Sequence, residues 1–211
     1  MSFFIKEIFY TLQGEGHHSG RPAVLCRFSN CNLWSGKEKD RQTAICKFCD
    51  TDFLGTDGPG GGYYTAEEEV IATINSMVGS CLTPKPYIVF TGGEPALQLT
   101  NKMILEAKAN GYETAIETNG TTDIPNGIDW ITVSPKAGTR LVVTSGNELK
   151  LVWPQPGISI HHFEQYSFDH YYLQPKDGLT AKESTREVID FCLRNPLWKL
   201  SIQTHKYIGI R

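Results

Sequence analysis

The sequence has no apolar run long enough to cross a membrane and no excess of positive charge. Its longest uncharged stretch, residues 70–84, is interrupted by Thr, Asn, Ser and Gly and falls short of the roughly 20 apolar residues that a membrane span requires. Twenty Lys and Arg stand against 23 Asp and Glu, a net charge of −3, whereas nucleic-acid binding needs clustered basic residues. These absences predict a soluble protein that binds neither membranes nor nucleic acid.

The N-terminus lacks the basic, apolar and small-residue regions of a secretory signal, which predicts a cytoplasmic protein. A reducing compartment directs clustered thiols toward metal or redox chemistry rather than disulfides. The cysteines are therefore candidate ligands, and there are six of them: Cys26, Cys31, Cys46, Cys49, Cys81 and Cys192.

The chain of 211 residues is also short for a complete barrel of eight strand–helix units, which typically needs about 250 residues. Runs of strand length recur at 3–10, 22–29, 86–91, 113–118, 128–134, 147–153, 170–175 and 199–204. Helical patterns lie at 66–77, 97–110, 158–166 and 181–194. Strands alternating with helices predict an α/β fold with a parallel sheet, open or partly closed into a barrel. No linker or repeat divides residues 1–211, so we expect a single domain.

Two threonines precede helical patterns and are expected to cap them. Thr65 stands before the helix at 66–77, where Glu68 would complete a capping box. Thr180 stands in the same position before the helix at 181–194.

Residues 30–63 interrupt the alternation with a polar, Gly-rich loop that contains the motif C-x14-C-x2-C, made by Cys31, Cys46 and Cys49. A loop this long in a compact domain is usually functional or disordered. Three thiolates suit three irons of a [4Fe–4S] cluster and leave the fourth iron without a protein ligand, whereas structural zinc requires four ligands. Spacing alone leaves a zinc site open, with Cys26, Cys81 or a histidine as the fourth ligand; otherwise Cys26, Cys81 and Cys192 are expected to pack as small apolar side chains.

The Gly-rich run at 55–62 lacks the spacing of known phosphate-binding loops and does not open a helix after a strand. We interpret it as a flexible connector.

The strand at 86–91 ends in Gly92-Gly93-Glu94-Pro95. Glycines at a strand end let the backbone approach a ligand closely, and a neighbouring carboxylate can accept hydrogen bonds from an ammonium group. A simple turn capped by Glu94 and Pro95 would give the same pattern, but the cysteine motif makes a ligand site the better reading.

Arg27 interrupts a strand whose two faces are otherwise apolar, because Ala23 and Leu25 alternate with Val24, Cys26 and Phe28. A buried arginine needs an anion. The sequence allows an internal ion pair, with Glu15 in the preceding turn as the candidate partner, or a bidentate clamp on a substrate carboxylate. His17 and His18 in that turn are expected to be solvated.

Polar residues end three further strands, at the edge where ligands bind in barrel-like folds. They are Glu117 and Asn119, Ser134 and Lys136, and the segment 174–177. Turn caps explain Glu117 and Asn119 equally well.

The C-terminal segment is unusually apolar for a terminus, which suggests that Ile208 and Ile210 pack against the domain. A surface strand with a solvated His205 is the alternative.

Taken together, these motifs resemble the radical S-adenosylmethionine superfamily and, within it, the 7-carboxy-7-deazaguanine synthase family. The resemblance rests on FYTLQGEG, RFSNCNLW, the loop through CDTDF, TGGEP, ETNG, SPK, ELKLV, LQPKD and QTHKYIGIR, and so covers nearly the whole chain. The usual C-x3-C-x2-C signature is expanded by an eleven-residue insertion, as in some members of that family.

The resemblance implies a lyase that converts 6-carboxy-5,6,7,8-tetrahydropterin to 7-carboxy-7-deazaguanine with loss of ammonia, through a 5′-deoxyadenosyl radical and without a general base. It implies a [4Fe–4S] cluster on Cys31, Cys46 and Cys49, Mg²⁺ at Thr51, and S-adenosylmethionine. Contacts to that cofactor would come from Phe48, Gly92, Gly93, Glu94, Ser134, Lys136, Gln174, Pro175, Lys176 and Asp177. Substrate contacts would come from Leu12, Gln13, Gly14, Glu15, Arg27, Thr91, His205 and Arg211, with the C-terminal residues folded over the active site.

The family also implies a homodimer and a flavodoxin or similar electron donor. Two other functions remain open at this point. One is an enzyme that activates a glycyl radical on a partner protein with the same scaffold, and the other is a zinc-stabilised binding module without catalysis.

Length sharpens the fold prediction once the loop is subtracted. About 34 residues spent on the cluster loop leave too few for eight units, so we predict a partial (β/α)6-type barrel of about six strands with an open side.

Overall fold

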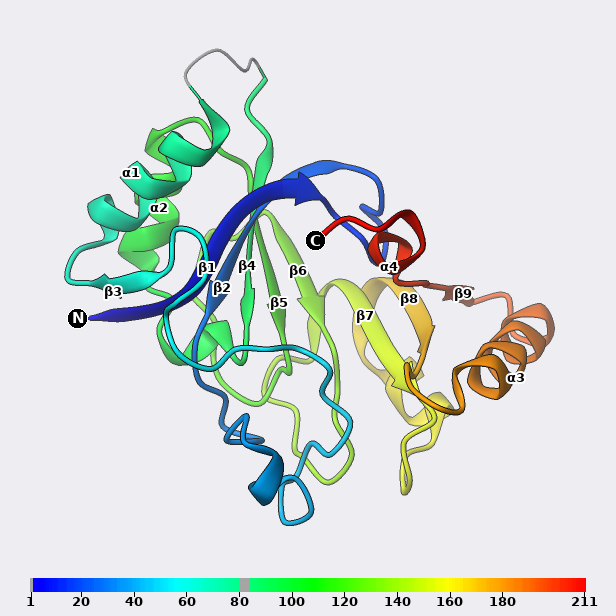
Figure 1. The fold of residues 1–211 in the computed structure, drawn as a ribbon. Helices are drawn as coiled ribbons and strands as arrows, with labels where there is room; N and C mark the ends of the chain where they lie inside the picture. The colour runs from blue at the N-terminus through cyan, green and yellow to red at the C-terminus, as the bar shows by residue number, and fades with distance from the viewer. Residues whose placement is uncertain (1, 80–83) are drawn as a thin grey trace.

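The computed structural model describes residues 2–79 and 84–211, so the prediction for Cys81 lies outside the described residues. Those residues form one nine-stranded sheet that curls without closing (Figure 1). Its order is β3-β1-β2-β4-β5-β6-β7-β8-β9. The strands are β1 (Phe3–Leu12), β2 (Pro22–Phe28), β3 (Gly62–Tyr64), β4 (Tyr87–Gly92), β5 (Thr114–Thr118), β6 (Trp130–Val133), β7 (Ser145–Trp153), β8 (Ser167–Pro175) and β9 (Trp198–Leu200).

The strands from β2 onward, except β3, run parallel and make the barrel wall. β1 and β3 add an antiparallel edge, because a short turn returns β1 directly into β2. The partial, open barrel is therefore confirmed. It has more strands than predicted because the edge and the three-residue β9 extend the wall.

The described residues contain few helices, and this leaves enough of a short chain to form nine strands. They are α1 (Glu67–Val78), α2 (Asn101–Ala109), α3 (Ala181–Arg194) and the short α4 (Thr204–Ile208), with single 3₁₀ turns at Glu38–Asp40, Pro95–Leu97 and Ile160–Gln165. The connections from β5 to β6 and from β6 to β7 contain no helix. No helix in the described parts of the chain is long and apolar enough to cross a membrane.

Helix ends differ from the sequence prediction in three places. α1 is capped at Ala66, and the carboxylate that accepts from the backbone N–H groups of Thr65 and Ala66 belongs to Glu69, not Glu68. Thr180 precedes α3 without a side-chain cap. The predicted helix at 97–110 is split, because Thr100 accepts a hydrogen bond from the Met103 backbone and starts α2 afresh.

Two apolar cores lie outside the barrel wall. One packs α1 and α2 on the outer faces of β1, β2, β4 and β5, and includes Val24, Cys26 and Phe28. The other packs α3 on β7, β8 and β9, with Cys192 at its margin. The inner face holds only a thin apolar layer that includes Ala23 and Leu25. The prediction that both faces of β2 carry apolar residues is thus confirmed, and so is the prediction that Cys26 and Cys192 pack as apolar side chains. The rest of the inner face carries mainly polar side chains.

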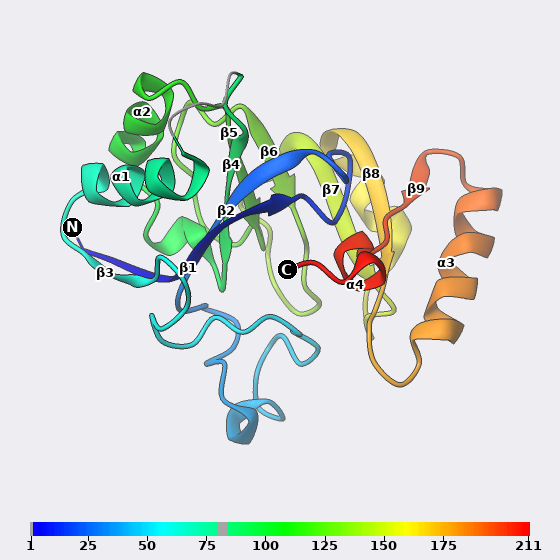
Figure 2. The ribbon, with the colours of Figure 1, turned by 45° about the horizontal axis from the view of Figure 1, so that its top comes forward.

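The C-terminal segment fills the open side of the barrel between β1 and β9 (Figures 1 and 2). The Ser201 hydroxyl accepts a hydrogen bond from the Gly16 backbone N–H, and the Thr204 backbone N–H donates to the Gly14 carbonyl. The Thr11 hydroxyl donates to the backbone carbonyl of Arg211. The strand predicted at 199–204 ends at Leu200, and the tail turns into α4. The tail is thus hydrogen-bonded to the domain and is not a surface strand. The side chains of Ile208 and Ile210 are 59% and 37% exposed, however, so the prediction that these two residues pack against the domain is wrong.

The Gly-rich run at 55–62 is bound along β1 and is not a free connector. Backbone bonds join Gly58 to Lys6 and Ile8 to Pro59. A Cβ at Gly58 or Gly61 would lie within 2.8 Å of the Lys6 carbonyl or closer. Glycine is therefore needed for close packing against β1 at the point where its register shifts.

Candidate active site

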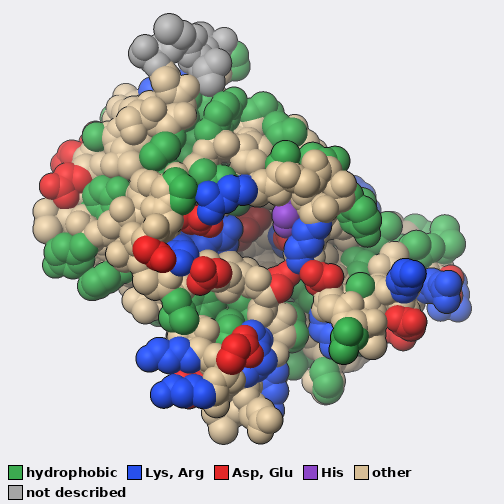
Figure 3. Space-filling model, viewed as in Figure 1, with side chains coloured by type: hydrophobic (Ala, Val, Ile, Leu, Met, Phe, Trp, Pro, Cys, Tyr) green, Lys and Arg blue, Asp and Glu red, His purple; other side chains and the backbone are tan. Residues whose placement is uncertain are grey.

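A cavity of about 380 Å³ opens at the carboxyl ends of the parallel strands, a usual size for a small-molecule site. Figure 3 shows it as a hollow with acidic and basic side chains at its rim. All but one of the sequence-predicted residues line it: Leu12, Gln13, Gly14, Glu15, Arg27, Cys31, Cys46, Phe48, Cys49, Thr51, Thr91, Gly92, Gly93, Ser134, Lys136, Gln174, Pro175, Lys176, Asp177, His205 and Arg211.

The cluster loop brings its three cysteines to one side of the cavity. Arg41 holds the loop in shape, because its guanidinium donates to the carbonyls of Lys47 and Cys49 at 3.1 Å and lies over the Trp34 ring. The Leu33 backbone N–H points at the Cys31 sulfur, 3.4 Å away. Hydrogen bonds to sulfur and a partly shielded loop are features of iron–sulfur sites.

Among the residues that the structure describes, no three His, Cys, Asp or Glu side chains lie close enough together to bind one metal ion. A zinc module needs such a convergence, whereas the thiolates of a [4Fe–4S] cluster each bind a different iron. The described residues are therefore compatible with a [4Fe–4S] cluster on the three cysteines.

Gly92 and Gly93 serve close packing of the chain as well as lining the cavity. A Cβ on Gly92 would lie 2.2 Å from the Phe28 carbonyl oxygen, and one on Gly93 would lie 2.0 Å from that of Asn30. These glycines let β4 press against the end of β2, where the segment leading to Cys31 begins.

Glu94 differs from its prediction. It is fully buried, and its oxygens accept hydrogen bonds from Thr118 and from the backbone N–H groups of Ala96 and Asn119. Burial raises its pKa, although the bonds from Asn119 and Thr118 oppose the shift. The carboxylate lies behind the cavity wall and joins strand ends instead of facing a ligand.

Asn119 contributes to the same framework. Its amide donates to Asn32 at 3.0 Å and its carbonyl accepts from Thr121. Asn119 thus ties the end of β5 to the cluster loop.

Arg27 has an internal partner, but the partner is Glu7 and not Glu15. The two residues are directly opposite in the β1–β2 ladder, and Nε lies 2.9 Å from the carboxylate. The other oxygen of Glu7 accepts from Arg211 at 2.5 Å. Two guanidinium groups thus share one carboxylate at this end of the cavity, which leaves donors free for a second anion.

The opposite end, the cavity floor, is built from Glu15, Glu117 and Lys150. Lys150 forms an ion pair with Glu15 and lies 3.6 Å from Glu117. Burial would raise the pKa of Glu15, but the Lys150 ammonium outweighs burial and lowers the pKa to about 2. Burial likewise opposes the charge on Lys150, yet the glutamates raise its pKa above the ordinary value. These charges persist at neutral pH.

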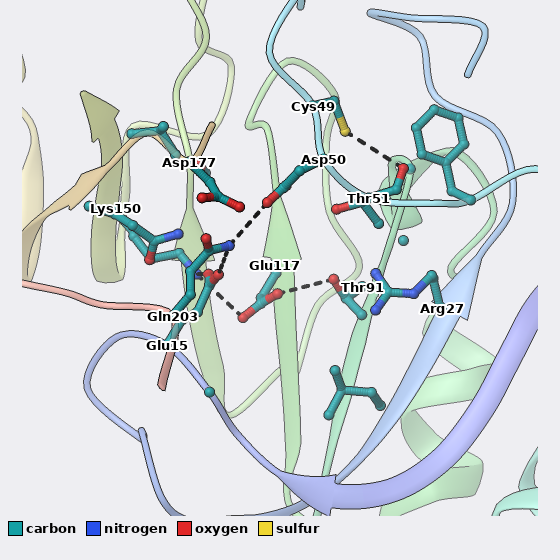
Figure 4. A pocket seen from close by; sticks show the side chains of 18 of the residues that line it. Glu15, Arg27, Cys49, Asp50, Thr51, Thr91, Glu117, Lys150, Asp177 and Gln203 are labelled. Atoms are coloured by element: carbon teal, nitrogen blue, oxygen red, sulfur yellow. Dashed lines mark hydrogen bonds and ion pairs between the residues drawn. The ribbon is translucent and has the colours of Figure 1, made fainter. Parts of the chain in front are cut away.

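Neutral donors complete the floor. Gln13 and Thr91 each donate to Glu117 at 3.0 Å, and Gln203 from the tail donates to Glu15 at 2.9 Å (Figure 4). The tail and the barrel wall therefore position the same carboxylates.

The rim of the cavity joins three distant segments. Lys206 of α4 pairs with Asp50 of the cluster loop at 2.7 Å and with Asp177 at 2.6 Å. Lys136 is turned back on Ser134, to whose hydroxyl it donates at 2.8 Å. His205 lies against Gly14, where a Cβ would overlap the imidazole, so glycine at position 14 makes room for the tail.

Sequence reasoning missed several lining residues: Glu7, Asp50, Lys150, Gln203 and Lys206. The β1–β2 register would have revealed Glu7 as the partner of Arg27. Lys150 stands in an apolar strand, as Arg27 does, and could have been found by the same argument.

The prediction for His17 and His18 was wrong for one of them. His17 is exposed, although its ring stacks 4.2 Å from that of His170. His18 packs on Trp130 and Tyr87, and its Nε2 is buried without a hydrogen-bond partner in the structure.

Comparison with known proteins supports one family. A comparison with family profiles finds no match. The chain is 54% identical to 7-carboxy-7-deazaguanine synthase of Nitratidesulfovibrio vulgaris and 53% identical to that of Bradyrhizobium diazoefficiens, covering all of each protein. It is 39% identical to the enzyme of Bacteroides thetaiotaomicron over 98% of both chains.

A solved structure agrees with these relatives. The crystal structure of QueE from Escherichia coli superposes with a TM-score of 0.71 at 25% identity, over 97% of this chain and 95% of that one. With full-length identity above 50% to proteins of one name, and with their fold, the chain belongs to the 7-carboxy-7-deazaguanine synthase family of radical S-adenosylmethionine enzymes.

Proposed function

We propose that this chain is a lyase that converts 6-carboxy-5,6,7,8-tetrahydropterin to 7-carboxy-7-deazaguanine and ammonia, a step of 7-deazapurine (queuosine) biosynthesis. The observation that carries the proposal, beside family membership, is the division of charge in the cavity. Arg27 and Arg211 stand at one end and the carboxylates of Glu15 and Glu117 at the other. An elongated molecule with a carboxylate at one end and an N–H-rich ring at the other fits this arrangement.

Arg27 would bind the substrate carboxylate in bidentate fashion, because Glu7 engages Nε and leaves its terminal nitrogens available. Glu117, with Glu15 beside it, would accept hydrogen bonds from the amino and ring N–H groups of the pterin. Gln13 and Thr91 hold Glu117 in position from two sides. His205 and Arg211 would close the site from the tail and exclude water.

The cofactors follow from the family: an iron–sulfur cluster and S-adenosylmethionine. When bound, they together supply a radical that abstracts hydrogen from the substrate. Cys31, Cys46 and Cys49 would hold the cluster. Gly92, Gly93, Ser134, Lys136 and Phe48, with the segment 174–177, would orient S-adenosylmethionine against the cavity wall.

The test is an anaerobic incubation of the reduced, cluster-loaded protein with S-adenosylmethionine and 6-carboxytetrahydropterin. We expect one 7-carboxy-7-deazaguanine and one ammonia for each pterin consumed. A protein that holds its full iron and sulfide and cleaves S-adenosylmethionine, yet forms no deazapurine, would contradict the proposed reaction.

Thr51 would serve as a Mg²⁺ ligand once substrate oxygens complete the shell, because Mg²⁺ prefers oxygen ligands and retains several waters. The proposal is supported by the position of Thr51 on the cavity wall. Thr51→Ala should abolish stimulation by Mg²⁺ while Thr51→Ser retains it. Equal stimulation of both variants would exclude this ligand.

A flavodoxin-type protein would supply the electron. Support comes from three exposed lysines on the cluster loop, Lys37, Lys39 and Lys47, which suit an acidic partner. Reversing their charge should slow reduction by the protein donor but not by dithionite, and equal slowing by both would contradict this site.

The chain would also act as a homodimer. Large apolar side chains are exposed on and after α3, including Leu193 and Leu197. Sedimentation of the cluster-loaded protein at a monomer's mass would contradict the dimer.

A further inference from the structure

A second, very small cavity lies behind the floor of the active site. It measures about 10 Å³, roughly the space of one water molecule. Gln13, Glu15, Glu117 and Thr132 line both cavities, so only this layer of side chains separates them. The remaining walls come from the amino-terminal ends of the strands and from the β1–β2 turn: His18, Tyr87, Val89, Ala115, Trp130 and Glu148.

Two polar atoms in this rear cavity lack partners. The hydroxyl of Tyr87, a residue only 1% exposed, and Nε2 of His18 are buried without a hydrogen bond in the structure. Buried polar groups are satisfied almost without exception, by protein or by ordered water. A water in the rear cavity would satisfy both atoms.

Glu148 is the buried acid at this site. It is 2% exposed and accepts a hydrogen bond from the His17 backbone at 2.8 Å. A Cβ on Gly16 would lie 2.2 Å from its carboxylate, so the turn is built around this side chain. A nearby cation, Lys150, already pairs with Glu15 and lies beside Glu117.

The surroundings of Glu148 favour its protonated form near neutrality. Burial raises its pKa to about 7, although Lys150 and the His17 bond oppose the shift. The titratable groups that face it are Glu15, His17 and His18 from the turn, Tyr87 from β4, Glu117 from β5, Lys150 from β7, and His170 and Tyr172 from β8.

A connection to solvent exists on the far side. His17 is exposed, stacks on His170, and lies with Nδ1 3.5 Å from the Tyr172 hydroxyl. On the front side, Gln203 and Lys206 of the tail reach Glu15 on the floor and Asp50 at the rim of the active site. The rear offers a second polar route, from the exposed His17 to the floor.

We propose that Glu148 and a water in the rear cavity relay a proton from solvent to the active-site floor. The inference rests on the proposed function. Conversion of the pterin to the deazapurine releases one NH₃, which takes up one proton and leaves as ammonium. The Glu148 carboxyl gives that proton through the water and Glu117, and solvent then reprotonates it past His17. No electron is exchanged, and Glu148 acts without touching the substrate.

The test compares Glu148→Gln with the wild-type holoenzyme across pH 6 to 8. We expect the wild-type kcat to fall above about pH 7 as Glu148 loses its proton. The variant should be at least about tenfold slower at pH 6 and should lack the inflection, with little change in KM. Glu113→Gln, in the exposed pair with Arg21 near the same turn, is the matched control and should keep the wild-type profile.

A second variant keeps the test independent of folding at position 148. Tyr87→Phe removes an unpaired hydroxyl without changing charge, and it should lower kcat several-fold while retaining the inflection. A high-resolution crystal structure should show a water within hydrogen-bond distance of Tyr87 and His18. A Glu148→Gln enzyme with the wild-type kcat and profile would overturn the relay, as would an empty rear cavity. A wild-type enzyme that forms no deazapurine would overturn the proposed function itself.

Discussion

The two ends of the active-site cavity carry excess charges of opposite sign. At one end Arg27 and Arg211 share the single carboxylate of Glu7, and the terminal arginine is 59% exposed. At the other, Glu15 and Glu117 share the single ammonium of Lys150, whose side chain is 6% exposed. One end has an extra positive charge on the C-terminal tail, and the other has an extra carboxylate on the barrel wall. We expect this difference to favour one orientation of a substrate that carries a carboxylate at one end.

Removing the shared cation of the floor should have the largest effect. Lys150→Met removes a buried ammonium and leaves the partly buried carboxylates of Glu15 and Glu117 without a counter-charge, which costs at most about 3–5 kcal/mol of unfolding free energy. Urea unfolding under anaerobic conditions measures the loss. Lys102→Met, which removes an exposed pair with Glu67 and Glu68, should cost at most about 1 kcal/mol. Equal losses in the two variants would show that the floor is not a buried charge network.

The pH dependence of stability should be the next largest effect. Glu148 has its pKa raised from 4.5 to about 7 by burial, so the folded protein holds this proton more tightly than the unfolded chain. The stability that protonation contributes is complete below about pH 4.5 and is lost as pH rises through about 7, a change of roughly 3 kcal/mol.

Glu148→Gln removes this titration. The variant should therefore gain stability relative to wild type between pH 5 and pH 8, measured by urea unfolding at both values. A constant difference between the two proteins would contradict the raised pKa.

Arg27→Ala tests the positive end and should raise the apparent KM for the carboxypterin about 100-fold, because a charge-assisted bidentate bond is lost. Glu7 retains Arg211 as a partner, so iron content and thermal stability should stay near wild type. Normal saturation by substrate would show that the carboxylate binds elsewhere.

Arg211→Ala should have the smallest effect, because an exposed guanidinium loses less on removal. We expect a rise in KM of about fivefold. If Arg211→Ala matched Arg27→Ala, the exposed arginine of the tail would bind the substrate as strongly as the arginine of the barrel wall, and the contrast with Arg27 would be wrong.

Local patterns in the sequence were enough for much of the site. The C-x14-C-x2-C spacing, the strand-terminal Gly92-Gly93 and the buried position of Arg27 each pointed to residues that line the cavity. Because the carboxyl ends of parallel strands meet at one edge of the sheet, the sequence also predicted that Ser134, Lys136 and the segment 174–177 lie at this cavity. These features are readable because each depends on neighbours in sequence.

The sequence did not predict which side chains would contact one another. Arg27 was matched with Glu15, yet a hairpin register placed Glu7 opposite it. Glu94 was expected to face a ligand, yet the backbone of the next strand took up its oxygens. His18 was expected in water, yet the turn folds under the barrel onto Trp130. Each error concerns a contact between elements distant along the chain.

By itself, the sequence determined most of the strands, the cluster loop and the incompleteness of the barrel, because these follow from periodicity, spacing and length. Its motifs carried the resemblance to the family. Only the tertiary structure decided how the charges are shared and that the tail completes the wall between β1 and β9. It also decided that an acid and two unpaired polar atoms meet behind the active-site floor. The physical reason is that burial and ion pairing depend on which residues meet in three dimensions.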